Sequence, residues 1–309
     1  MDDFKLEKIY TIPKFGTSGC FSLDNKYAYS YQYNARTIQK LEISTGRVAI
    51  LHKFPITTYI ASDLYYHHTG NLFFVVGENI TKGMIFKILT CQTSSGKINV
   101  HDNMQFESDD TYANFAFLNN CLLVHFYGEL IIIDLDTGTV IFNKVFPAHS
   151  RLQTKSIGFS NNYVAVPLGR MVKIFDIANS KKIFTLNIAR VKNITFSANE
   201  KYLVCTAVNN EIRQNVLYIL NFHTGAVIRK INLGSIFDYG LVFSPSGENV
   251  FINTDGDDFL FYNIPTSQIL SFEKDIDTGG RITGKSIVSN DLNYLLSSSE
   301  TSSTLWKVV

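Results

Sequence analysis

Residues 195–202 read Thr-Phe-Ser-Ala-Asn-Glu-Lys-Tyr, and residues 217–225 read Leu-Tyr-Ile-Leu-Asn-Phe-His-Thr-Gly. The first stretch is an apolar strand that ends in Phe-Ser, followed by a polar turn and the start of a second strand. The second stretch is a third strand that runs into a Thr-Gly turn. Strand-length apolar runs separated by Asn, Asp, Ser and Gly are typical of antiparallel β-structure.

The same opening recurs seven times along the chain. The openings occupy residues 20–27, 60–63, 116–120, 158–163, 195–202, 242–247 and 287–294. Third strands align with them independently, at residues 38–46, 84–96, 130–138, 172–180, 217–225, 259–267 and 305–309. The anchor residues Phe21 and Val288 lie six intervals apart, so the period is about 44 residues, and a period of about 40–45 with four short strands is typical of a β-propeller.

The two ends of the chain complement each other. The seventh repeat stops at Val309, after its third strand. Residues 4–12 precede the first opening and fit a strand, with Leu6, Lys8 and Tyr10 on one face. We expect residues 4–12 to complete the blade formed by residues 285–309, because this pairing removes exposed sheet edges. The sequence therefore predicts an all-β fold: a single seven-bladed β-propeller domain spanning residues 1–309, with four antiparallel strands per blade and the last blade closed by the N-terminal strand.

Two stretches carry a resemblance to a known group of proteins. Residues 243–248 read Phe-Ser-Pro-Ser-Gly-Glu, and residues 305–308 read Leu-Trp-Lys-Val. With these stretches and its repeat, the chain resembles the WD40, YVTN and quinoprotein-like propeller superfamily over essentially its whole length. It departs from that pattern because no repeat has Gly-His before its first strand and no third strand ends in Trp-Asp. The resemblance implies a fold rather than an activity.

Composition excludes several functional classes. The chain of 309 residues has 28 basic and 27 acidic side chains, so it lacks the basic excess of a nucleic-acid binder. No apolar run approaches the roughly 18 residues that a membrane span needs, and the N-terminus does not resemble a signal peptide. We expect a cytoplasmic protein that is monomeric by itself.

One formal motif match suggests a nucleotide, but its context does not. Residues 279–286 read Gly-Gly-Arg-Ile-Thr-Gly-Lys-Ser, which fits the phosphate-binding loop G-x-x-x-x-G-K-S. That loop needs a buried strand before it and a helix after it, whereas here a propeller strand follows. We interpret residues 279–286 as a connection between blades and expect no cofactor.

Other local signals also have structural explanations. Asp134-x-x-Thr137-Gly138 is similar to the docking repeat of quinoprotein dehydrogenases but lacks the Trp, and Thr-Gly suits a tight hairpin. The acidic clusters at residues 109–110 and 255–258 match no Ca²⁺ loop and fall at predicted turns. The seven His residues show no metal-ligand spacing, and the pair at residues 67–68 is expected to face solvent. We therefore predict no metal site.

Cysteine usage points to packing rather than chemistry. Cys20, Cys121 and Cys205 lie on expected strands and are interpreted as small core residues, whereas Cys91 lies near a turn and is expected to be exposed. Four Cys in a chain of this length do not form a disulfide framework.

The resemblance directs attention to loops. In propellers of this superfamily, the loops between blades and those between second and third strands share one face, where partners usually bind. In this chain those loops are rich in the Tyr, Phe and Arg side chains that dominate protein interfaces. The predicted partner-binding residues are Phe15, Tyr31, Tyr33, Arg36, Tyr59, Asp109, Asp110, Tyr112, Arg151, Arg170, Arg213, Phe237, Asp238, Tyr239, Asp257 and Arg281.

Three functional classes stay open at this point. The leading hypothesis is a non-enzymatic propeller that binds a protein partner as a scaffold, adaptor or inhibitor, with a toxin-neutralising immunity protein as one form. The alternative is an enzyme of the lactonase or lyase type, which would need a cluster such as His, Glu and Arg and a metal at the channel mouth. The third class is a binder of a small molecule or carbohydrate. No catalytic residues are identified.

Overall fold

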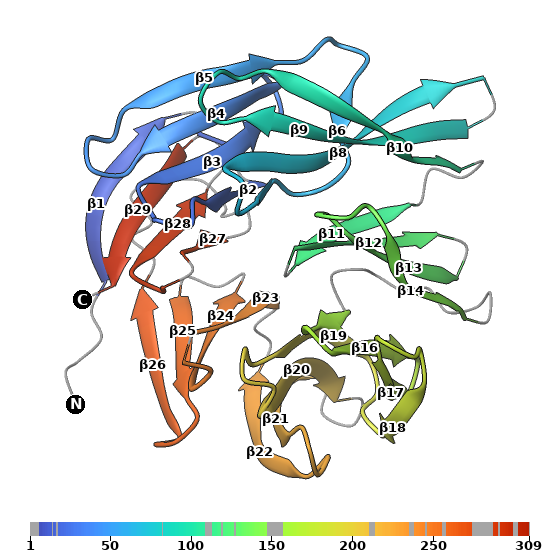
Figure 1. The fold of residues 1–309 in the computed structure, drawn as a ribbon. Helices are drawn as coiled ribbons and strands as arrows, with labels where there is room; N and C mark the ends of the chain where they lie inside the picture. The colour runs from blue at the N-terminus through green and yellow to red at the C-terminus, as the bar shows by residue number, and fades with distance from the viewer. Residues whose placement is uncertain are drawn as a thin grey trace. The chain divides into compact units, whose positions relative to one another are not determined.

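A computed structural model describes most of the chain (Figure 1). The described residues are 6–13, 15–16, 18–81, 83–108, 113–118, 120–126, 128–146, 157–209, 214–234, 238–244, 246–254, 258–273, 287–289, 291–298 and 302–308. Their strands form seven antiparallel sheets in a β-propeller, which confirms the predicted fold class.

Each blade is a meander of neighbouring strands. Blade one contains β2 (Ser18–Phe21), β3 (Tyr27–Gln32), β4 (Thr37–Glu42) and β5 (Val48–Lys53). Blade two contains β6 (Tyr59–Ile60), β7 (Tyr65–Tyr66), β8 (Asn71–Ile80), β9 (Gly83–Gln92) and β10 (Ile98–Ser108), where β6 and β7 both pair with β8 and share the first position. Blade three contains β11 (Asn114–Leu118), β12 (Cys121–Phe126), β13 (Glu129–Asp134) and β14 (Val140–Val145).

The remaining blades follow the same order. Blade four contains β15 (Gly158–Phe159), β16 (Tyr163–Leu168), β17 (Met171–Asp176) and β18 (Lys182–Leu186). Blade five contains β19 (Val191–Phe196), β20 (Tyr202–Asn209), β21 (Gln214–Asn221) and β22 (Val227–Gly234). Blade six contains β23 (Asp238–Phe243), β24 (Asn249–Thr254), β25 (Asp258–Asn263) and β26 (Gln268–Glu273), and blade seven contains β27 (Ile287–Val288), β28 (Tyr294–Ser298), β29 (Ser302–Val308) and β1 (Leu6–Pro13).

The N-terminal strand closes the seventh blade, as predicted. Figure 1 shows β1 alongside β29, and the antiparallel register joins Leu6 to Val308 and Ile12 to Ser303. The expected alternation is interrupted within this strand, because the register shifts between Lys8 and Tyr10. Such a bulge turns the side chains beyond it and leaves Ile12 buried.

Hydrogen bonds at the turns explain why Phe-Ser recurs at the openings. The hydroxyl of Ser197 accepts the backbone N–H of Tyr202 at 2.9 Å and donates to Asn199 Oδ1 at 2.8 Å. Ser22 and Ser289 make the same pair of bonds within their own turns. A short hydroxyl side chain thus replaces backbone partners that the turn would otherwise leave unpaired.

The Thr-Gly turns are tight hairpins, as interpreted from the sequence. Gly138 adopts a φ of +68° and donates its N–H to the Asp134 carbonyl at 2.9 Å, while Thr137 donates its N–H to Asp134 Oδ1 at 2.8 Å. Positive φ costs Gly nothing, which explains this residue at the turn.

The chain divides into two compact units. The first consists of Met1–Phe126, Asp134–Thr139 and Asp277–Val309, and the second consists of Tyr127–Ile133 and Val140–Ile276. The single domain expected from the sequence stays a prediction.

Each unit has its core between adjacent blades. In the first unit, Ile12, Leu41 and Leu305 belong to one buried cluster, and Tyr29, Phe54, Phe74 and Cys91 belong to another. In the second unit the two corresponding clusters join blade four to blade five and blade five to blade six. The expectation that Cys91 is exposed is wrong: its side chain is fully buried against blade one, because the long strand β9 carries it into the core.

Candidate functional site

Two loops of the first unit form an exposed surface of mixed chemistry. The β3–β4 turn carries Tyr33, which is 72% exposed, and the connection after β5 carries Ile56, which is 82% exposed. Arg36 joins the two segments, since its backbone carbonyl accepts the Phe54 N–H at 2.9 Å and its Nη1 donates to the Pro55 carbonyl at 3.3 Å. We call Tyr33, Arg36 and Ile56 the loop surface.

Buried aromatic rings hold the loop surface from below. Tyr31 packs edge-on against Tyr33 with ring centroids 6.4 Å apart, and also against Phe54 at 6.4 Å. Phe54 in turn meets Phe74 of blade two at 5.7 Å. Aromatic pairs in these geometries stabilise contacts beyond simple burial, so both loops start from fixed positions.

The structure separates the predicted contact residues into two kinds. Tyr33 and Arg36 reach solvent on the loop surface. Phe15 and Tyr31 are only 3% and 5% exposed and belong to the core, so they cannot offer contact area to a partner. Tyr59 is a brace: its ring lies against Gly77 and its hydroxyl donates to Met84 Sδ at 3.1 Å.

The remaining predicted partner-binding residues lie away from the loop surface or outside the described residues. Arg170 is exposed in the β16–β17 turn of the second unit. Asp238 and Tyr239 begin β23 instead of lying in the connection before it, which corrects the expected loop boundary. The predicted positions outside the described residues are Asp109, Asp110, Tyr112, Arg151, Arg213, Phe237, Asp257 and Arg281, together with the motif at 279–286.

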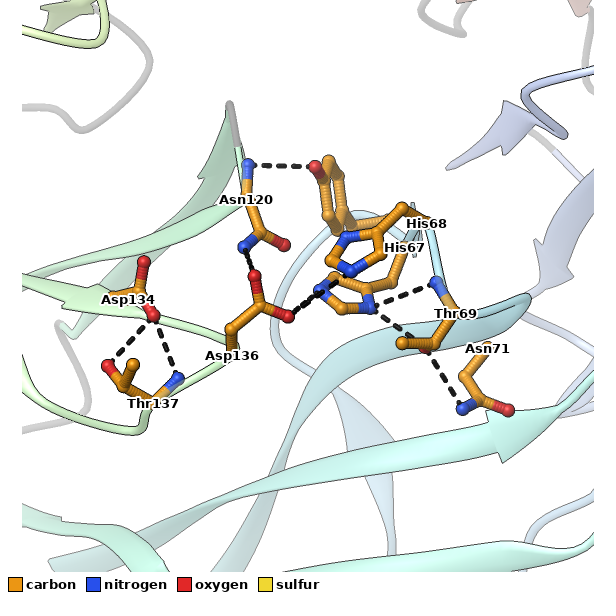
Figure 2. Close-up of polar contacts among 9 residues, drawn as sticks. His67, His68, Thr69, Asn71, Asn120, Asp134, Asp136 and Thr137 are labelled. Atoms are coloured by element: carbon orange, nitrogen blue, oxygen red, sulfur yellow. Dashed lines mark hydrogen bonds and ion pairs between the residues drawn. The ribbon is translucent and has the colours of Figure 1, made fainter.

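A second cluster lies at hairpin turns of blades two and three (Figure 2). His67 and His68 occupy the β7–β8 turn, and Asp136 occupies the β13–β14 turn. Asp136 Oδ1 lies 3.3 Å from His67 Nε2 and 3.4 Å from His68 Nε2. The expectation that both His residues face solvent is half wrong, because the His67 side chain is 2% exposed and that of His68 is 57% exposed.

Neighbouring groups fix the geometry of this cluster. His67 Nδ1 lies 2.8 Å from the Thr69 hydroxyl, which also accepts Asn71 Nδ2 at 3.2 Å. On the other blade, Asn120 Nδ2 donates to Asp136 Oδ2 at 2.6 Å. Burial lowers the pKa of His67 below its ordinary value and the His68 side chain lowers it further, while the Asp136 carboxylate opposes both effects.

Sequence reasoning missed this cluster. Adjacent His residues in a turn do not have metal-ligand spacing, and Asp136 comes from another blade. The sequence around Asp136 does contain the Asp and Thr-Gly of a tight hairpin. That pattern predicts the β13–β14 turn, but it does not show that the His-bearing turn of blade two lies beside it.

No protein-family model matches this chain, and no curated protein sequence matches it significantly. In the part of the chain that the structure describes, no helix has the length and apolar character of a membrane span.

Proposed function

We propose that this protein binds a protein partner through the loop surface and acts without catalysis, as a scaffold, adaptor or inhibitor. One observation carries the proposal: Tyr33 and Ile56 are largely exposed on two loops that Arg36 holds together. An exposed aromatic ring, an aliphatic side chain and a guanidinium on a fixed support are the combination that dominates protein interfaces.

The support matters because binding costs less when the contact residues are already ordered. The rings of Tyr31 and Phe54 are buried under the loops, and the Arg36 backbone carbonyl ties the turn to the following connection. A partner would therefore meet loops whose backbone does not have to be ordered on binding.

The test compares two variants of the full chain as bait in the cells that make it. The first combines Tyr33→Ala with Ile56→Asp. The second, Ile50→Asp, changes a matched aliphatic residue that is 65% exposed on the outer strand β5 of the same blade. Proteins recovered with each bait are measured quantitatively against the unmodified chain.

We expect at least one recovered protein to be captured about tenfold less by the double variant and equally well by Ile50→Asp. The reason is that truncating central interface residues costs more than about 1.4 kcal/mol of binding free energy. A direct measurement with that purified protein should show the same order of dissociation constants. If both variants recover the same proteins as the unmodified chain, the loop surface is not the binding site and the proposal fails.

We further propose that the chain is a divergent member of the WD40, YVTN and quinoprotein-like superfamily. Its support is the repeat of about 44 residues, the closure by the N-terminal strand and the Ser-based turn that recurs at the openings. An inhibitor of the immunity type is one form of this function, and the identity of the recovered partner decides it.

A further inference from the structure

We infer that His67, His68 and Asp136 form a binding site for a divalent transition-metal ion, and that Zn²⁺ is the ion their chemistry favours. The three side chains present one ligand atom each within 4.8 Å of one another. Two imidazoles and one carboxylate form a ligand set that Zn²⁺ takes in proteins, with water in the remaining position.

The distances match the geometry of this ion. Two ligand atoms bound at about 2.0–2.1 Å from Zn²⁺ at the tetrahedral angle stand about 3.3–3.4 Å apart. Asp136 Oδ1 lies 3.3 Å from His67 Nε2 and 3.4 Å from His68 Nε2, so two of the three edges are already in place. The third edge, between the two imidazole nitrogens, is at most 4.8 Å, and the 57% exposed His68 side chain would have to rotate to shorten it.

Two buried polar atoms at this position lack a hydrogen-bond partner among the described residues. One is Nε2 of His67, whose side chain is only 2% exposed, and the other is Asn120 Oδ1. The Asn120 side chain approaches His67 without the geometry of a full hydrogen bond, so this position is imperfectly satisfied and an ion could displace that contact.

The surrounding hydrogen bonds suit a metal ligand. Bound through Nε2, His67 would carry its proton on Nδ1 and donate it to the Thr69 hydroxyl 2.8 Å away, in place of the 3.3 Å bond that the Thr69 backbone N–H donates to Nδ1 without the ion. Asn120 Nδ2 donates a hydrogen bond to Asp136 Oδ2 at 2.6 Å. The other carboxylate oxygen, Oδ1, is directed at both imidazoles, as Figure 2 shows. Groups of this kind orient metal ligands and raise affinity.

The site would link two blades. His67 and His68 belong to the β7–β8 turn of blade two, whereas Asp136 belongs to the β13–β14 turn of blade three. An ion held by both turns joins blades that are otherwise joined at this point by the Tyr65 hydroxyl, which accepts the Asn120 N–H at 2.8 Å. The inference is independent of the loop surface and of the proposed partner.

The experiment titrates the full chain, freed of any affinity tag and of bound metal, with Zn²⁺ in a calorimeter. We expect one equivalent per chain with a dissociation constant of about 1 µM or below, and a rise in melting temperature with added Zn²⁺. His68→Ala and Asp136→Asn should each weaken binding at least about tenfold. Both residues are substantially exposed, so these variants should keep the unmodified melting temperature in the absence of metal.

The matched control is His223→Ala, which removes an exposed His from the β21–β22 turn of blade five, the counterpart of the Asp136-bearing turn of blade three, and should leave Zn²⁺ affinity unchanged. Co²⁺ in place of Zn²⁺ should give the intense visible bands of a tetrahedral site. Binding weaker than about 100 µM, or affinity that survives both His68→Ala and Asp136→Asn, would overturn the inference. Equal loss in His223→Ala would do the same, because it would show general surface coordination.

Discussion

The closure of blade seven by β1 gives a sharp test through Ile12. This side chain is 5% exposed and packs in the cluster between blades seven and one, while its backbone pairs with Ser303. Replacing a fully buried Ile by Ala costs about 2–5 kcal/mol, and replacing it by Val about 0.5–1.5 kcal/mol. We therefore expect Ile12→Ala to lower the free energy of unfolding by about 2–5 kcal/mol, with Ile12→Val between it and the unmodified chain.

The chain carries its own probe for this experiment. Trp306 is the single Trp, is 5% exposed, and pairs with Lys8 of β1 across the closing ladder. Urea unfolding followed by Trp fluorescence reports blade seven, and far-UV circular dichroism reports all strands. Ile12→Ala should move the fluorescence midpoint at least as far as the dichroism midpoint.

The matched control is Thr11→Ala, an exposed neighbour on the same strand that should change the free energy of unfolding by less than about 0.5 kcal/mol. The reasoning is refuted if Ile12→Ala shifts the midpoints no more than Thr11→Ala does. That result would mean that β1 contributes no buried packing to the folded protein.

Three further predictions concern single positions. Burial raises the pKa of Cys91 to about 11, so its thiol should react with a thiol reagent at neutral pH only after unfolding, and rapid labelling of the native chain would contradict this. Burial lowers the pKa of His125, so the unfolded chain binds a proton more readily and the free energy of unfolding should fall as pH drops from 7 to 5. His125→Leu should reduce that fall, and a variant with the same pH profile as the unmodified chain would contradict this role of His125. Gly96→Ala should destabilise the chain more than Gly169→Ala in urea unfolding, because both have positive φ but only the Gly96 Cβ would overlap the Leu51 carbonyl oxygen, and equal losses would remove that explanation.

Short-range chemistry made most of the fold predictable. The hydroxyl of Ser197 accepts a hydrogen bond from the backbone N–H of Tyr202, five residues along the chain. The Gly138 N–H donates to the Asp134 carbonyl and closes a hairpin over a similarly short span. Signals of this range repeat whenever the unit repeats, so the blade count and the closing strand could be predicted from the sequence. The bulge beside Lys8 could not, because its cause is the pairing with a strand from the other end of the chain.

The candidate sites depend on longer-range packing, and there the sequence was less informative. The sequence does not show whether the ring of a loop Tyr packs into the core or lies in solvent. Here Tyr31 is buried, whereas Tyr33 is 72% exposed. Which ring turns inward is decided by Phe54 and by blade two beyond it. His67 shows the same limitation, since its neighbour Asp136 is supplied by a different blade.

The two proposed sites lie at opposite ends of strands, and this makes them separable. Burial raises the pKa of the Tyr66 phenol and Asp24, in the β2–β3 turn, raises it further, so the β2–β3 turn and the His-bearing β7–β8 turn share one end of their blades. Tyr33 lies beyond the other end of β3, a strand about 20 Å long at 3.3 Å per residue. Substitutions that far apart without shared partners act independently, so the Tyr33→Ala and Ile56→Asp double variant should bind Zn²⁺ as the unmodified chain does. A change in its metal affinity would show that the strands between the two ends couple them, and the partner and the ion would then have to be treated as one system.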